Sequence, residues 1–365
     1  MKNIPNFVPY NAPNTKKYVD DCISTGWIGT GKYLEAVEKL VKQIFGVKYV
    51  ILVNNGTNAC RLALIGCGIT AGKILSPVFT YIATNNAIVS VGAEPVFVDA
   101  DENTWNINTD IVKGILTETD QIKAVMAVNL LGKSVNYTTF LSLAQSCGVK
   151  IIEDNCQSIL ATYEGKYTGT IGDAAAFSFF SNKIISCGEG GMVFFKKEED
   201  YKRALLYKNQ GRDYTKGRYY HDSYGENFNL TNLQAAILLA QLEDANHITH
   251  KRTKIDTWYR EYLKDVVDVR FRGEVDSNDV VWYVTLFAYK REELIKFMKK
   301  NGVSLNPVWK LNNEMPHLQQ YSLGQYETAK YISDYCVMLP TYVDMTKEDV
   351  KRVCDLIKVF YYGTK

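Results

Sequence analysis

Long apolar runs are absent from this sequence, because no stretch approaches the roughly eighteen consecutive apolar residues of a membrane-spanning helix. Residues 1–13 contain one lysine and no apolar run of signal-peptide length. We therefore expect no membrane partner and a cytoplasmic location.

An excess of charge of one sign is also absent, since the sequence has 42 Lys and Arg residues and 40 Asp and Glu residues, a net charge of +2. This balance gives no electrostatic reason to expect nucleic acid as a partner and favours a small-molecule substrate. The eight cysteines include no C-x-x-C pair, and no histidine lies near them at zinc-ligand spacing. We expect them to be reduced and structural, and we predict no metal site.

Two nucleotide-binding signatures are missing or broken. No G-x-G-x-x-G follows the first predicted strand, which disfavours a dinucleotide-binding dehydrogenase. Residues 26–33 come close to the phosphate-loop pattern G-x-x-x-x-G-K-[ST], but Tyr33 replaces the small hydroxyl residue that should hold magnesium. Residues 20–24 do not form the buried strand that such a loop follows, so a nucleoside triphosphatase is not expected.

The sequence does contain an α/β pattern. Between residues 49 and 195, short β-rich apolar runs alternate with helical stretches, as in a mostly parallel sheet flanked by helices. A long helix is expected over 231–244 with Thr231 or Asn232 as its N-cap, followed by a strand over 280–289 and helices near 291–301 and 347–361. Seven strands are expected in the first part, at 49–53, 73–76, 95–98, 124–128, 150–153, 174–179 and 192–195.

A chain of 365 residues is too long for one core of ordinary size. The change of pattern after the long helix predicts two domains. We expect a large α/β domain over residues 1–245, including the N-terminal segment, and a smaller α+β domain over residues 246–365.

Polar residues follow several of the predicted strands at their carboxyl ends, where open parallel sheets bind ligands. Gly56 and Thr57 lie where the first strand passes into a helix, so free N–H groups and a hydroxyl could hold a phosphate. Tyr81 follows the second strand and could stack on a flat heterocycle. Taken singly, these residues are also consistent with an ordinary turn and with packing.

Two further strands end in reactive groups. Asp154 and Gln157 follow the strand at 150–153, where a carboxylate could keep a ring nitrogen protonated and an amide could bind a phenolic oxygen. Lys183 comes just after the apolar strand at 174–179, so burial could lower the pKa of its amine and make it a nucleophile toward an aldehyde. Ser178 would add a hydroxyl to the phosphate site.

On these residues, the sequence resembles the DegT/DnrJ/EryC1/StrS family of pyridoxal-phosphate (PLP) dependent nucleotide-sugar aminotransferases, which have the type I aminotransferase fold. The resemblance runs from residues 9–10 to 339–340 and is densest at 55–57, 77–87, 153–157, 178–191 and 225–241. The spacings agree as well, with three residues from Asp154 to Gln157, twenty-one from there to Ser178 and five from Ser178 to Lys183.

The resemblance implies a role for each matching residue. Lys183 would attach the cofactor covalently, Asp154 would pair with its ring nitrogen and Gln157 would contact its O3′ oxygen. Tyr81 would cover one ring face, and the phosphate ligands would be Gly56, Thr57 and Ser178.

A second subunit is also implied, because Asn227 matches a family asparagine that reaches the phosphate of the neighbouring subunit. A homodimer with a shared active site is therefore expected. Many relatives have arginine two residues after this asparagine, whereas this chain has Asn229, which puts one local substrate or subunit contact in doubt.

The segments 23–28 and 98–108 are most similar to perosamine- and viosamine-type 4-aminotransferases. The implied reaction moves an amino group from glutamate to C4 of a nucleoside-diphosphate 4-keto-6-deoxyhexose. The alternatives are a 3-aminotransferase for a 3-keto sugar nucleotide and a catalytically silent binding or sensor homologue; a PLP-dependent sugar dehydratase would have histidine in place of Lys183. Side chains that could line the sugar-nucleotide site, or equally serve packing or the surface, are Trp27, Phe79, Trp309, Lys310 and His317.

Overall fold

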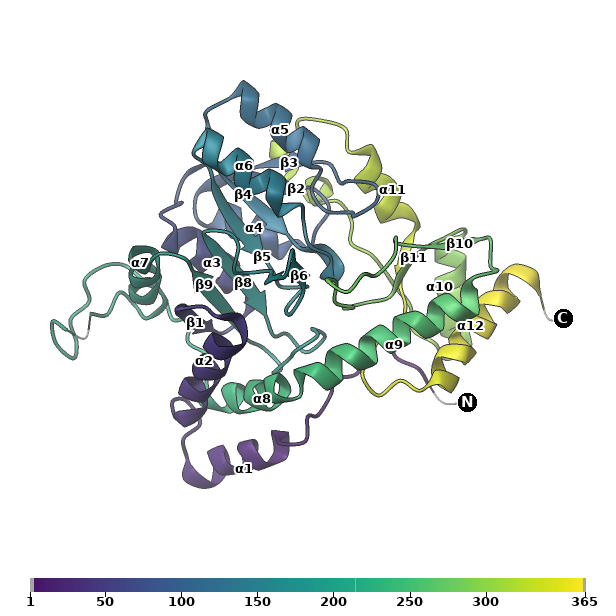
Figure 1. The fold of residues 1–365 in the computed structure, drawn as a ribbon, viewed down its shortest axis with the longest axis horizontal. Coiled ribbons are helices and arrows are strands. Elements are labelled where there is room, and N and C mark those ends of the chain that lie inside the picture. The colour runs from purple at the N-terminus through teal and green to yellow at the C-terminus, as the bar shows by residue number, and fades with distance from the viewer. Residues whose placement is uncertain (1–2, 214, 364–365) are drawn as a thin grey trace.

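The computed structural model describes residues 3–213 and 215–363 and has a seven-stranded sheet at its centre (Figure 1). Its order is β1-β9-β8-β5-β4-β2-β3, and every pair is parallel except those that β9 forms with β1 and β8. All seven predicted strands are present, which confirms the mostly parallel α/β sheet. Their bounds are β1 (Tyr49–Val53), β2 (Gly72–Pro77), β3 (Ala93–Val98), β4 (Ile122–Val128), β5 (Lys150–Asp154), β8 (Ala174–Ser178) and β9 (Gly191–Phe195).

Helices cover both faces of the sheet, which explains why its strands are continuously apolar rather than alternating. On one face, Ile51 and Val193 pack in a buried cluster with Leu62 of α3 (Gly56–Gly66). On the other, Leu52 and Phe194 pack in a cluster with α2 (Lys32–Phe45) and α8 (Asn232–Glu243). The remaining helices of this part are α1 (Thr15–Thr25), α4 (Ala83–Ser90), α5 (Thr109–Glu118), α6 (Tyr137–Cys147) and α7 (Glu198–Lys208).

A second, antiparallel sheet lies toward the C-terminus. Its order is β10 (Val269–Phe271), β11 (Thr285–Ala288), β13 (Cys336–Met338) and β12 (Asn306–Pro307). The helices here are α9 (Ala245–Leu263), α10 (Arg291–Lys300), α11 (Glu327–Tyr335) and α12 (Lys347–Tyr362), so the helices expected near 291–301 and 347–361 are confirmed. α9 runs from beneath the large sheet to this second region (Figure 1). The predicted domain boundary at 245/246 falls just after the first residue of α9, Ala245, and the division itself stays a prediction.

The start of the chain joins this second region. Ile4 forms a parallel bridge with Val303, and the Asn6 side-chain amide donates a 3.0 Å hydrogen bond to the carbonyl oxygen of Met338. The first and last parts of the sequence therefore meet in one layer.

The strand predicted over 280–289 is wrong in extent, because β11 spans only Thr285–Ala288. The preceding apolar residues are bound to the large sheet region instead of to a neighbouring strand. Val280 donates its N–H to Gly132 O at 3.1 Å, and the Trp282 indole donates to Asn182 O at 2.7 Å. A small hairpin of β6 (Thr162–Tyr163) and β7 (Lys166–Tyr167) was not expected.

Thr231 is the N-cap of α8, where it forms a capping box with Gln234. The next residue, Asn232, binds the segment that resembles a phosphate loop. Its side chain accepts from the Tyr33 N–H at 2.9 Å and donates to Trp27 O at 2.6 Å. Residues 27–33 thus dock on the start of α8 and belong to the packing of the N-terminal helices.

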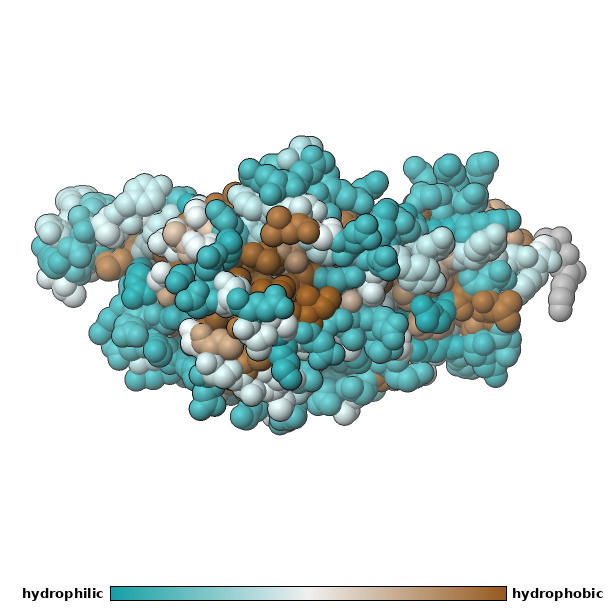
Figure 2. Space-filling model, turned by 90° about the horizontal axis from the view of Figure 1, so that it is seen from above, coloured by the Kyte–Doolittle hydropathy of each residue, from teal (hydrophilic) through white to brown (hydrophobic). Residues whose placement is uncertain are grey.

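Hydrophilic side chains cover most of the face seen in Figure 2, and a group of hydrophobic ones lies near its centre. None of the helices in the described part of the chain has both the length and the apolar character needed to cross a bilayer.

Candidate functional site

A pocket of about 310 Å³ opens where β1, β2, β5 and β8 end. Its walls come from the start of α3, from the segments after these strands, and from residues 282–283, 306, 309 and 338 of the second region. Of the eight residues predicted from the sequence, the structure brings seven together here: Gly56, Thr57, Tyr81, Asp154, Gln157, Ser178 and Lys183.

One end of the pocket has the features of a phosphate site. α3 begins at Gly56, and its N-cap Asn55 accepts the N–H of Asn58, which leaves the N–H groups of Gly56 and Thr57 at the helix start. A Cβ at position 56 would lie 2.5 Å from the Ser178 Cβ and 2.8 Å from its Oγ. Only glycine therefore lets the helix start approach Ser178 so closely, and the cradle fits a phosphate group.

The pocket also holds a buried carboxylate. Asp154, the last residue of β5, is 3% exposed. One of its oxygens accepts the Thr84 hydroxyl at 2.7 Å, and the other accepts the Cys156 N–H at 3.1 Å. Asp154 is thus fixed in place by neutral donors and forms no ion pair with any of the described residues, which leaves its charge available to a protonated ring nitrogen.

Gln157 is buried beside this carboxylate, at 2% exposure. Its amide oxygen accepts the Leu131 N–H at 2.9 Å, and this bond fixes the orientation of the amide. The NH₂ group is therefore the part of Gln157 available to donate into the pocket, as a phenolic oxygen would require.

Lys183 lies after the strand β8, with its amine over the ring of Trp282 at 3.7 Å from the centroid. No hydrogen bond or ion pair to this amine occurs among residues 3–213 and 215–363. Burial lowers the pKa of the Lys183 amine to about 8, although the Asp154 carboxylate acts in the opposite direction. The amine can therefore lose its proton near neutral pH and act as a nucleophile.

Aromatic side chains form one wall of the pocket. Tyr81 is half exposed and meets Trp309 edge-on at 6.4 Å, and Trp309 stacks on Trp282 at 6.1 Å. A flat ring held between Lys183 and Asp154 would face this wall. PLP fits the whole arrangement, because the pocket offers a phosphate cradle, a nucleophilic amine, a buried carboxylate and an amide donor.

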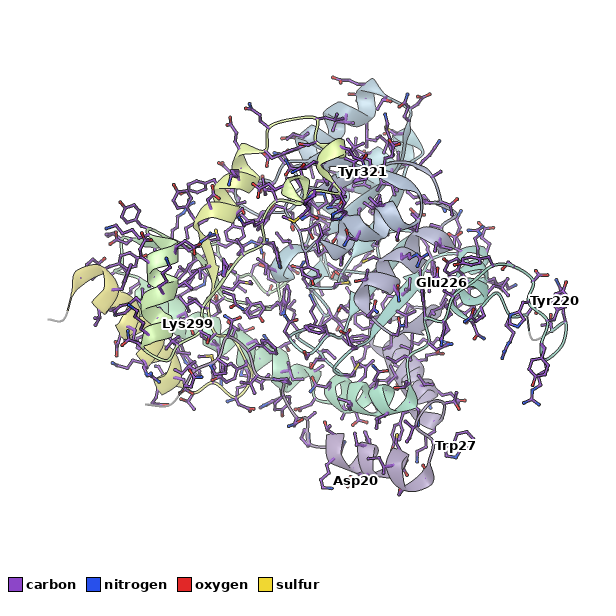
Figure 3. The ribbon with its side chains drawn as sticks, turned by 180° about the vertical axis from the view of Figure 1, so that it is seen from behind. Asp20, Trp27, Tyr220, Glu226, Lys299 and Tyr321 are labelled. Carbon is purple, nitrogen blue, oxygen red and sulfur yellow. The ribbon has the colours of Figure 1, made fainter. Side chains whose placement is uncertain are left out.

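Asn227 is the predicted residue that does not line this pocket. It is exposed, and its side-chain oxygen accepts the Asn229 amide at 2.8 Å. It follows Glu226 at the base of an arm that carries Tyr220 and projects away from the body (Figure 3). An exposed position outside its own pocket agrees with the expected contact to a neighbouring subunit, and that contact stays a prediction.

Of the residues suggested for the sugar-nucleotide site, some lie at the pocket and others lie away from it. Trp309 lines the pocket, and Phe79 is buried behind it with the two rings 5.7 Å apart. Trp27 lies at the edge of the molecule, 61% exposed (Figure 3). Lys310 is exposed, and His317 binds the Asn86 side chain at 2.8 Å; neither lines the pocket.

Sequence reasoning missed several pocket residues. Thr84 lies within the segment 77–87 and could have been found there as a hydroxyl in the first turn of a helix. Trp282, Tyr283, Asn306 and Met338 come from the second region, and no spacing in the sequence connects them with Lys183. Cys60 and Cys156 lie side by side in the pocket wall although they are 96 positions apart.

Known proteins resemble this chain over nearly its whole length. The profile of the DegT/DnrJ/EryC1/StrS aminotransferase family matches residues 9–358. A GDP-perosamine synthase of Escherichia coli O157:H7 is 35% identical over 99% of both chains, and one of Caulobacter vibrioides is 34% identical over 93% of both. The crystal structure of a DegT DnrJ EryC1 StrS aminotransferase from Brucella abortus has a TM-score of 0.89 at 26% identity, covering 96% of this chain and 95% of the other.

Proposed function

Because the chain belongs to the DegT/DnrJ/EryC1/StrS aminotransferase family, we propose that it transfers the amino group of glutamate to C4 of a nucleoside-diphosphate 4-keto-6-deoxyhexose. The product is a 4-amino-4,6-dideoxy sugar nucleotide of the perosamine or viosamine type. Its cofactor is PLP. The similarity to GDP-perosamine synthases makes a GDP-linked sugar the first substrate to test.

One observation carries this proposal. The Lys183 amine and the buried Asp154 carboxylate line the same pocket, together with the phosphate cradle of Gly56 and Ser178. An amine, an anion and a phosphate site in one pocket of this size are what binding of PLP requires.

When bound, PLP supplies an aldehyde that condenses with amines and a ring that withdraws electrons from the carbon next to the condensed nitrogen. The residues of this chain do the rest. Lys183 would hold the cofactor until the amino donor enters, and its free amine would then accept the proton of the donor's α-carbon and hold it for return. Asp154 holds negative charge against the ring nitrogen, and Gln157 donates to the phenolic oxygen.

The working unit we propose is a homodimer. Asn227 of each chain would contact the phosphate bound by the other chain, which its exposed position outside the pocket supports. A monomer with full activity would rule this out.

The test is to incubate the protein with PLP, glutamate and GDP-, UDP- and TDP-linked 4-keto-6-deoxyhexoses and to identify the product by mass and NMR. We expect an amino group at C4 with at least one substrate, and no product from Lys183→Ala. Amination at C3 of a 3-keto sugar would replace this proposal by the 3-aminotransferase alternative. A protein that acquires no visible-edge absorption from lysine-bound PLP would be a silent homologue.

A further inference from the structure

Two cysteines in the pocket wall have no part in the proposed reaction. The Sγ atoms of Cys60, on α3, and Cys156, after β5, are 4.0 Å apart. A carboxylate oxygen of Asp154 lies with them, and the three ligand atoms are all within 4.8 Å of one another. This is the one group of three such side chains that the described residues bring together.

The separation of the two sulfurs is that of a metal site. Two Zn–S bonds of about 2.3 Å at a tetrahedral angle place the sulfurs about 3.8 Å apart, close to the separation seen here. Thiolates select soft or borderline cations such as Zn²⁺ and Cd²⁺, and a carboxylate is an acceptable third ligand. The open side of the group faces the pocket, where water can supply a fourth ligand.

The surrounding structure holds the three ligands in place. The Cys156 N–H donates to Asp154 Oδ1 at 3.1 Å, and its thiol lies 3.8 Å from the carbonyl oxygen of Ala176 on β8. Cys60 is 1% exposed within α3, the helix whose start forms the phosphate cradle. A strand end, a strand and a helix thus set the geometry before any ion arrives.

We propose that Cys60, Cys156 and Asp154 form an inhibitory site for a thiophilic divalent cation, with Zn²⁺ as its ligand. Each thiol releases its proton to solvent when it binds the ion. The ion would occupy the carboxylate that the proposed function reserves for the ring nitrogen of PLP, so metal and cofactor would exclude one another. This exclusion rests on the proposed function, whereas the metal site itself rests on the three ligands alone.

Cadmium is the probe for the test, because cadmium thiolates absorb in the ultraviolet. The full-length protein, freed of PLP, is titrated with Cd²⁺. We expect one equivalent to bind, and we expect Cys60→Ser and Cys156→Ser each to weaken binding at least about tenfold, since a hydroxyl replaces a soft thiolate. Cys147→Ser is the matched control, because Cys147 is exposed on α6 and should leave the titration unchanged. Circular dichroism of each variant establishes that it folds.

The same titration is repeated after loading with PLP. Linkage requires the two ligands to weaken one another by the same factor, so PLP should lower the cadmium affinity and cadmium should lower the PLP affinity equally. Cadmium binding that survives in a folded Cys60→Ser, Cys156→Ser double variant would overturn the metal site. A cadmium titration that PLP does not change, in a protein that binds both ligands, would overturn the proposed inhibition. Cadmium binding by a protein that takes up no PLP would support the site and count against the proposed function alone.

Discussion

The Lys183 amine nitrogen lies 3.7 Å from the centre of the Trp282 ring, and the same indole donates its N–H to Asn182, the residue before Lys183. The backbone of Trp282 is held in turn, because the buried Arg252 donates to its carbonyl oxygen at 2.7 Å. A residue of the second region thus covers the amine and binds the backbone that carries it.

Trp282→Leu removes the ring face over Lys183. A cation over an aromatic ring gains about 0.5–2 kcal/mol, so the pKa of Lys183 should fall below its present value of about 8. Trp282→Phe keeps a ring face and loses only the hydrogen bond to Asn182, so the pKa of Lys183 should change less in this variant. The pH profile of PLP attachment measures both, and equal profiles for the Leu variant and the parent would contradict the role given to Trp282.

The pH dependence of cofactor attachment follows from Lys183 itself. The neutral amine is the nucleophile, and burial lowers its pKa from 10.5 to about 8. The rate at which the cofactor-free protein binds PLP should therefore rise with pH and level off above about 8, which stopped-flow absorbance can follow. A rate that keeps rising to the pKa of an ordinary lysine would show that the amine is not buried.

Thr84→Val removes the 2.7 Å hydrogen bond to Asp154 and keeps the side-chain shape. A hydrogen bond to a charged group contributes about 1.5–3 kcal/mol, so the rate of the reaction with glutamate should fall roughly tenfold to more than a hundredfold. Thr84→Ser is the matched control, because it keeps the hydroxyl. If the Val and Ser variants react equally fast, Thr84 does not position the carboxylate.

Gly56→Ala should weaken PLP binding without unfolding the protein. The new Cβ would lie 2.5 Å from the Ser178 Cβ, so the helix start or Ser178 must shift. Such overpacking lowers the free energy of unfolding by about 1–3 kcal/mol, and the displaced cradle should bind PLP more weakly. Gly114→Ala in α5 meets no atom within 4 Å and should leave PLP binding unchanged while adding up to about 1 kcal/mol of stability. Absorbance titration and thermal unfolding separate the two effects, and equal PLP affinities in both variants would contradict the cradle.

The central sheet could be predicted because both of its faces are covered. All five residues of β8 and of β9 are buried, so their apolar runs stand out from the sequence. The extent of β11 could not be predicted, because Trp282 and Tyr283 belong to an equally apolar run that forms a pocket wall rather than a strand. The two-residue strands β6, β7 and β12 are too short to leave a periodic pattern.

The residues of the candidate site also fall into a group that the sequence predicts and a group that it does not. Gly56, Asp154, Ser178 and Lys183 follow strands of one sheet, so the position of each along the chain indicates that they meet. The side chains that contact these residues cannot be predicted from their positions along the chain. Trp282 reaches Lys183 across 99 residues, and Cys60 meets Cys156 through the packing of a helix on a strand end.

Two contacts of the N-terminal segment limit how early the chain can fold during synthesis. They are the bridge between Ile4 and Val303 and the hydrogen bond from Asn6 to Met338. The ribosome adds Met338, whose carbonyl oxygen accepts the hydrogen bond, 332 residues after Asn6. Met338 is also the residue of the pocket wall that lies furthest along the chain. A nascent chain can therefore complete neither its N-terminal layer nor its cofactor pocket until Met338 has been synthesised, so loading with PLP should follow synthesis of the second region.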